Sequence, residues 1–165
     1  MRRAFTLIEM MIVIAIIAII AAIAIPNLLE ARKHGDEASA IGSLKTINAS
    51  QAIYLERGAS GTYGDLGDLQ ADGYIDDVLG GGAKQGYNIG IRIDVKLNPA
   101  SSFLPITPPG QYEYFAYAFA AVPGQTGNRT FVTNQSGVIR FSDGTKTVFP
   151  SNLHFASDFK PIGGK

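Results

Sequence analysis

One carboxylate lies where a carboxylate is costly. Glu9 comes directly before an unbroken apolar run from Met10 to Ile25. An ionised carboxylate in a low-dielectric environment is strongly unfavourable unless a cation pairs with it. A simple membrane anchor has no use for this charge, so the chemistry that we predict for Glu9 is ion pairing with a cationic group of a neighbouring molecule.

Few other residues of the chain are arranged for chemistry. There are two histidines, His34 and His154, no cysteine, no Gly-x-Ser-x-Gly elbow and no phosphate-binding loop. We therefore do not expect an enzyme or a cofactor. A calcium site is one interpretation of a group of aspartates, because calcium prefers oxygen ligands, but their spacing does not match an EF-hand loop and favours helix caps and solvated side chains. These residues are Asp65, Asp68, Asp72, Asp76 and Asp77.

The overall charge argues against nucleic acid as the main partner. The 165 residues carry 14 basic and 14 acidic side chains, so there is no basic excess to neutralise phosphates. The length suits one modest domain and an anchor.

The element that must position Glu9 is a membrane-spanning helix. From Ala4 to Ile25 a helix would extend about 33 Å, close to the hydrocarbon thickness of a bilayer. Arg2 and Arg3 precede it, and no basic residue follows until Arg32. The positive-inside rule then predicts a single-pass protein with a cytoplasmic N-terminus.

Two simpler interpretations of this segment stay open. Ala22-Ile23-Ala24 is a possible signal-peptidase site, which would make the chain a secreted extracytoplasmic binding domain with an ordinary signal peptide. A plain bitopic anchor is the other, and it leaves Glu9 unexplained. Pro26 predicts a kink at which the helix continues, or else a helix boundary at the membrane surface.

Residues 27–57 predict an amphipathic second half of the same helix. Residues at three- and four-residue steps predict the face that rests on a sheet: Leu28, Ala31, Ile41, Leu44, Ile47, Asn48, Ala52 and Leu55. Charges four residues apart predict three ion pairs: Glu30–His34, Arg32–Asp36 and Lys33–Glu37.

The remaining residues, 58–165, predict a β-rich head. Residues 61–69 predict a loop that leads into a short helical turn. Alternating and aromatic segments, with Asp143-Gly144 as a hairpin signal, predict strands: 87–96, 112–122, 129–133, 138–142 and 145–149. The predicted fold class is α+β, with a long helix packed on an antiparallel sheet of about four or five strands.

The sequence from Phe5 to Glu9, with its short basic leader, resembles the N-terminus of type IV pilins and type II secretion pseudopilins. Pro26 and the residues after it are also similar to that family. The resemblance implies that a prepilin peptidase cuts between Ala4 and Phe5 and methylates the new amine of Phe5. The leader ends in Ala4, where the family usually has Gly, the one smaller residue.

The resemblance implies a filament subunit held in the bacterial inner membrane before an assembly platform adds it to identical or homologous subunits. Glu9 would then pair with the Phe5 amine of the next copy and fix the register. We expect a leader at 1–4, a membrane and filament-core segment at 5–25, an amphipathic segment at 26–57 and a head at 58–165. A surface pilus and a periplasmic secretion pseudopilus both fit; the absence of cysteine favours the second, because many surface pilins carry a disulfide.

Overall fold

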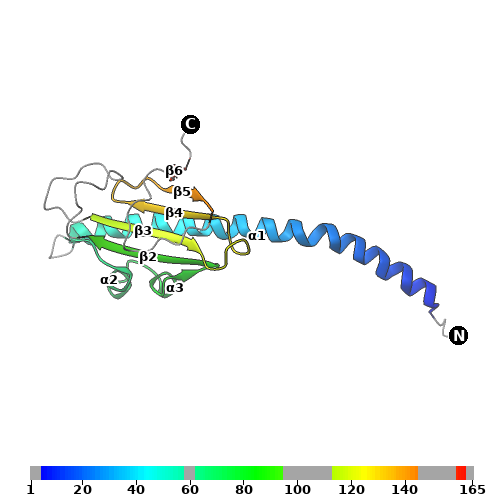
Figure 1. Ribbon diagram of the computed structural model, residues 1–165. Coiled ribbons are helices and arrows are strands. Elements are labelled where there is room, and N and C mark those ends of the chain that lie inside the picture. The colour runs from blue at the N-terminus through cyan, green and yellow to red at the C-terminus, as the bar shows by residue number, and fades with distance from the viewer. Residues whose placement is uncertain (1–4, 58–61, 95–112, 145–158, 163–165) are drawn as a thin grey trace.

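The computed structural model describes residues 5–57, 62–94, 113–144 and 159–162. Its dominant element is the helix α1, Leu7–Arg57, of 51 residues. Figure 1 shows the N-terminal half of α1 projecting from the head as a stalk, while its C-terminal half lies along the sheet. The predicted α+β architecture is confirmed.

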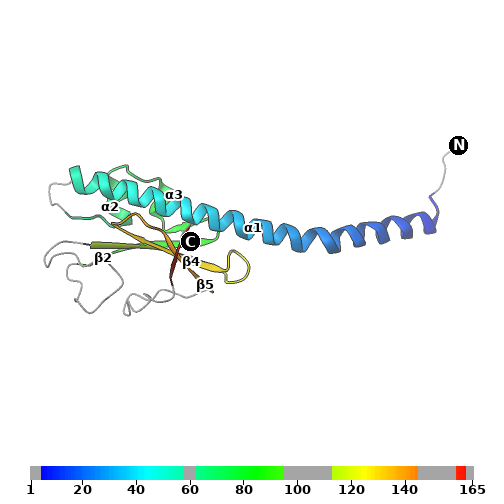
Figure 2. The same cartoon turned by 90° about the horizontal axis from the view of Figure 1, so that it is seen from above.

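The helix passes Pro26 without ending, so a helix boundary at Pro26 is ruled out. Proline has no amide hydrogen to donate and crowds the preceding turn. Figure 2 shows the N-terminal half of α1 as a smooth curve, without the sharp bend of a kink.

The sheet is an antiparallel meander whose strands follow one another in chain order, β1-β2-β3-β4-β5-β6. The four longer strands match predicted ones, whereas two strands of two residues each were not predicted. The predicted strand 145–149 lies outside the described residues, and within them β5 pairs with β6. The strands are β1 Ala83–Lys84, β2 Tyr87–Asp94, β3 Glu113–Ala120, β4 Arg129–Asn134, β5 Arg140–Asp143 and β6 Lys160–Pro161.

Two short helices, α2 (Leu66–Ala71) and α3 (Asp77–Gly80), connect α1 to the sheet. The predicted helical turn after the loop is α2, and α3 was not predicted. Figure 1 shows both helices beside the β1–β2 edge of the sheet.

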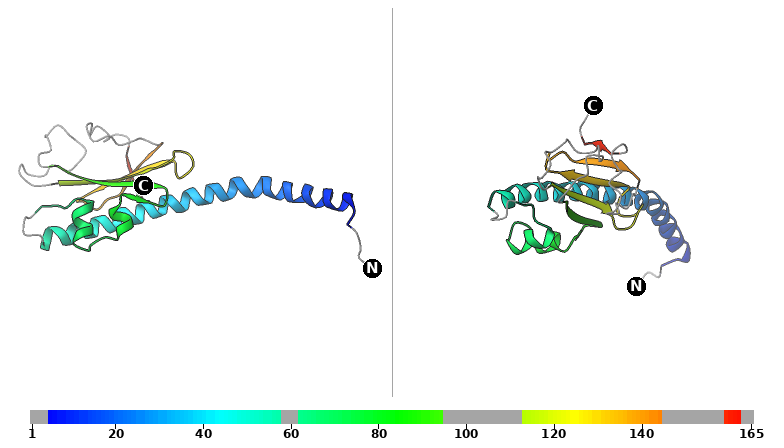
Figure 3. Two further views of the ribbon diagram at one scale, coloured as in Figure 1. Left: turned by 90° about the horizontal axis from the view of Figure 1, so that it is seen from below. Right: turned by 60° about the vertical axis from the view of Figure 1, so that its left-hand side comes forward.

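The core lies between α1 and one face of the sheet, which Figures 2 and 3 show as two layers. Leu44 and Ile47 of α1 are fully buried, and Ala116 and Ala118 of β3 present small side chains that let the helix approach the sheet closely. The buried residues of α1 all lie between Glu37 and Gln51. The prediction that the ends of this face rest on the sheet is therefore wrong, because four of its residues are exposed: Leu28, Ala31, Ala52 and Leu55. The buried residues of α1 are Glu37, Ala40, Ser43, Leu44, Ile47, Ser50 and Gln51.

Candidate assembly surface of the N-terminal helix

The N-terminal half of α1 exposes apolar side chains on every side. Phe5 is 74% exposed, Ile14 is 63% exposed and Ile23 is 64% exposed. The helix is long and apolar enough to cross a membrane, and none of its most apolar stretch is buried within the chain. Because apolar side chains on all sides of a helix require a non-aqueous environment, this surface needs lipid or other protein around it.

Glu9 is the one charged side chain between Phe5 and Leu29, and it takes part in capping the start of α1. Its Oε2 accepts a hydrogen bond from the Thr6 backbone N–H at 2.9 Å and one from the Thr6 hydroxyl at 2.7 Å. The Glu9 N–H donates to the Thr6 Oγ1 at 3.3 Å. This reciprocal arrangement is a capping box, which satisfies helix N–H groups that have no partner within the helix.

The sequence analysis missed this capping box. The signal was present, because Thr6-Leu7-Ile8-Glu9 has the Thr-x-x-Glu spacing of the motif. Phe5 comes just before α1 and Glu9 lies in its first turn, whereas Ala4 lies outside the described residues. Within the monomer Thr6 therefore holds Glu9 through two hydrogen bonds to the carboxylate oxygen Oε2.

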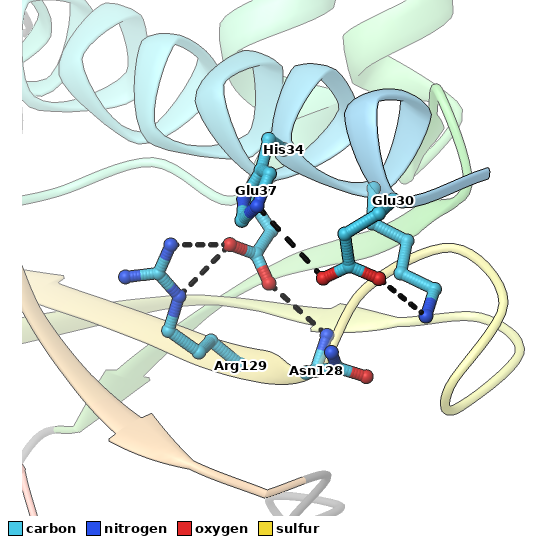
Figure 4. A network of polar contacts seen from close by, with 6 residues as sticks. Glu30, His34, Glu37, Asn128 and Arg129 are labelled. Carbon is cyan, nitrogen blue, oxygen red and sulfur yellow. Dashed lines mark hydrogen bonds and ion pairs between the residues drawn. The ribbon is translucent and has the colours of Figure 1, made fainter. Parts of the chain in front are cut away.

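An ion pair between the buried Glu37 and the partly exposed Arg129 fixes the other half of α1 to the head (Figure 4). The carboxylate of Glu37 accepts from the Arg129 Nε at 2.8 Å, from the Arg129 Nη2 and from the Asn128 backbone N–H at 3.0 Å. Burial raises the pKa of Glu37, but the hydrogen bonds from Arg129 and Asn128 outweigh it, so the net pKa is lowered. Glu37 is therefore ionised at neutral pH.

This pair corrects one sequence prediction. Lys33 does not pair with Glu37 but with Glu30, at 3.1 Å, because Glu37 faces the sheet. The other two predicted pairs are present: Glu30 with His34 at 3.8 Å and Arg32 with Asp36 at 4.0 Å.

Two amide side chains of α1 add further polar ties that the sequence did not reveal. Gln51 is fully buried; it donates to the Gly64 carbonyl and accepts from the Gly64 N–H at 3.1 Å. Asn48 accepts from the Tyr114 hydroxyl at 2.6 Å. Burial raises the pKa of Tyr114, which keeps this hydroxyl a donor. These contacts hold the C-terminal half of α1 on the head, and the N-terminal half projects from it as the stalk.

Three of the aspartates considered as a calcium site cap short helices, and Asp76 also pairs with Lys84 at 3.2 Å. Asp65 and Asp68 form a capping box at α2, and Asp76 caps α3 through the Leu79 N–H at 2.7 Å. Among the described residues there is no group of three or more His, Asp or Glu side chains that could hold a metal ion.

The N-terminal residues of the chain are similar to those of known proteins. The family description "Prokaryotic N-terminal methylation motif" matches residues 1–25. The leader and the apolar part of α1 are therefore similar to the N-terminus of proteins that carry this motif.

Two relatives with similar N-terminal sequences are both named as type IV pilus components. The type IV wide pilus major component PilA4 of Thermus thermophilus is 50% identical over 52 residues, which are 32% of this chain and 40% of that protein. The type IV major pilin protein PilA of Myxococcus xanthus is 49% identical over 53 residues, 32% of this chain and 24% of that protein. The predicted resemblance to the type IV pilin family is thereby confirmed. The matches span less than half of either relative, and no solved structure matches the chain.

Proposed function

We propose that this protein is a structural subunit of a type IV pilus. The observation that carries the proposal is the stalk of α1, which is apolar and exposed on all sides and carries one charge, Glu9, near its end. In a monomer this stalk suits a bilayer. In a filament the same surface becomes the core of a helical bundle, and a head-to-tail contact that never closes produces a fibre.

Processing comes first in this proposal. A prepilin peptidase cuts between Ala4 and Phe5 and methylates the Phe5 amine, as the methylation motif over residues 1–25 supports. Until then the chain spans the bacterial inner membrane once, with Arg2 and Arg3 in the cytoplasm and the head outside. An inner-membrane assembly platform then moves it into a filament of identical or homologous subunits.

The cut gives Glu9 its partner. The new amine of Phe5 in one copy is a cation at the edge of the bundle, and the Glu9 carboxylate of the neighbouring copy neutralises it. A subunit that slips by one turn leaves both charges unpaired in low dielectric, which is strongly unfavourable. The pair therefore fixes the register, while Pro26 gives the helix its curvature between the bundle and the head.

Two alternatives to a pilus subunit are a subunit of a secretion pseudopilus and a secreted binding domain. The relatives are pilus components, which favours a pilus over a secretion pseudopilus, whereas the absence of cysteine favours the pseudopilus. A secreted binding domain would require a cut after Ala24. This alternative is disfavoured because that position lies inside the continuous helix α1, and a cut there would remove the whole stalk.

The test separates the charge of Glu9 from its capping role. Glutamine at the same position can still form a capping box, so Glu9→Gln keeps the helix start and removes the charge. We expect Glu9→Gln and Glu9→Ala to insert into the membrane normally but to form no filaments. Glu30→Ala, which removes an exposed carboxylate from the same helix, is the control and should assemble. Normal filaments from Glu9→Gln would refute the charge pairing.

A further inference from the structure

The loop between β3 and β4 is exposed and uncharged, and it lies at the end of the head from which the stalk leaves. Figures 1 and 2 both show it at that end, in yellow. We call residues 121–127 the base loop. Its residues 121–125 are all exposed, Val122 to 45%, with Pro123 next to it. The base loop therefore presents an apolar tip on the side of the head nearest the stalk.

Every backbone N–H group of residues 121–126 has a partner within the chain. The Val122 N–H donates to the Thr126 hydroxyl at 3.2 Å. The others donate to backbone carbonyls, those of Ala121, Gly124, Gln125 and Thr126, and Pro123 has no N–H. An unpaired backbone donor is costly in a poorly hydrated layer. Because these donors are paired, the tip of the base loop can leave water without that penalty.

Contacts with α1 define the direction in which the base loop points. The Asn128 N–H donates to the Glu37 carboxylate at 3.0 Å, and the Asn48 amide donates to the Thr133 hydroxyl at 2.9 Å. β4 therefore runs beside α1 toward the C-terminus of that helix. The base loop comes before β4, so it extends from the level of Glu37 toward the stalk.

The length of the apolar run sets the level at which a membrane would end. From Glu9 to Leu29 the helix rises about 30 Å, the thickness of the hydrocarbon layer, and Glu30 is the first charge after it. Glu37 lies about 12 Å beyond Leu29, whereas the polar layer of a bilayer is about 5–7 Å thick on each side. The base loop must therefore bridge about 5–7 Å to reach lipid, which two extended residues span.

Arg32 lies on the same flank of α1, at the level of this polar layer. Its side chain is 74% exposed, and its distance of 4.0 Å to the Asp36 carboxylate makes a weak pair. Asp36 faces the base loop, because a Cβ on Gly86 would lie 2.6 Å from Thr126 and 3.4 Å from that carboxylate. Arg32, one turn nearer the stalk, is therefore beside the loop, and a guanidinium binds phosphate oxygens well.

We propose that the base loop is a contact with the lipid surface, made while the chain is still in the membrane. Val122 and Pro123 enter the polar layer, and Arg32 binds lipid phosphates beside them. This inference rests on the membrane insertion of the proposed function. Lipid is the occupant because the spanning helix brings the bilayer surface to this end of the head. The contact fixes how the head is turned about the stalk, and a subunit that leaves the membrane for a filament must break it.

The first test uses tryptophan, which the chain lacks, as the one fluorescent reporter of its kind. Val122→Trp in the full-length chain is placed in vesicles of phosphatidylcholine and phosphatidylglycerol, with acyl chains brominated near the headgroup. Val138→Trp is the matched control, since Val138 is 42% exposed and lies in the β4–β5 turn, at the opposite end of the sheet. We expect at least two-fold stronger quenching by brominated lipid at position 122 than at position 138, and the reverse order with acrylamide in the water.

The possible outcomes separate this contact from the proposed function. Ile17→Trp reports on the stalk, and its failure to be quenched by brominated lipid would refute the membrane insertion itself. Quenching there, without an excess at position 122 over position 138, would overturn the lipid contact alone. Shielding of position 122 from both quenchers would indicate a contact with another copy and would also overturn it. Gln125→Trp repeats the measurement if Val122→Trp lowers the melting temperature.

The second test concerns Arg32. Arg32→Gln, combined with Val122→Trp, should reduce lipid quenching in vesicles that contain phosphatidylglycerol to the level found in pure phosphatidylcholine, because the attraction to anionic lipid is lost. Lys45→Gln, which removes an exposed basic side chain much further from the stalk, should leave the quenching unchanged. Equal quenching from Arg32→Gln and Lys45→Gln would refute the binding of lipid phosphates by Arg32.

Discussion

Replacing Arg129 with methionine tests how the head holds the stalk. The substitution keeps most of the side-chain volume but removes the cation beside Glu37, whose side chain is 4% exposed and keeps only the hydrogen bond from the Asn128 N–H. Such a loss costs about 3–5 kcal/mol of unfolding free energy. The reverse substitution, Glu37→Gln, should cost about 1–2 kcal/mol, because Arg129 is 36% exposed and can be rehydrated, and the glutamine can still accept from the Asn128 N–H.

The assay is urea unfolding of the full-length chain in mild detergent, followed by circular dichroism. The double variant should cost less than the sum of the two single variants, because each removes the same interaction. The pKa of Glu37 is lowered in the fold, so its contribution is complete above its unfolded pKa and disappears as the pH falls through the folded pKa. The gap between wild type and Arg129→Met should therefore shrink from pH 7 toward about pH 3. Additive effects, or a larger loss from Glu37→Gln, would refute this reasoning.

Three further substitutions follow from the geometry. Thr6→Ala removes the cap of α1 and should cost about 1 kcal/mol, seen as faster amide exchange in the first turn, with Thr6→Ser close to wild type. Gln51→Leu leaves the Gly64 N–H and carbonyl unpaired and should cost about 2–4 kcal/mol in urea unfolding; no measurable loss would contradict it. Gly90→Ala drives a Cβ into the Tyr117 ring and should lower stability by about 1–3 kcal/mol, which Tyr117→Ala in the same chain should partly reverse.

The sequence predicted the elements that depend on periodicity. The apolar run and the three-and-four spacing indicated one continuous helix, and alternation indicated the four longer strands, because both patterns are local. The two-residue strands β1 and β6 carry no periodic pattern, and their pairing is set by neighbours in the sheet.

The polar ties between helix and head could not be predicted for a different reason. Glu37 and Gln51 read as ordinary solvent-facing residues of a helix, since charged and amide side chains are mostly exposed. The Arg129 that pairs with Glu37 lies 92 residues further along the chain, so only the packed fold brings them together. The capping box of Thr6 and Glu9, in contrast, was readable from four consecutive residues and was missed because Glu9 was interpreted through its neighbours in other copies.

The central claim is that the chain is cut at Phe5 and assembled through its stalk. The most direct measurement is the intact mass and N-terminal sequence of the protein recovered from sheared cell-surface filaments. Our account predicts a chain that begins at Phe5, carries one methyl group on its amine and retains all of α1. A soluble protein that begins at Ile25, with no filaments, would contradict it.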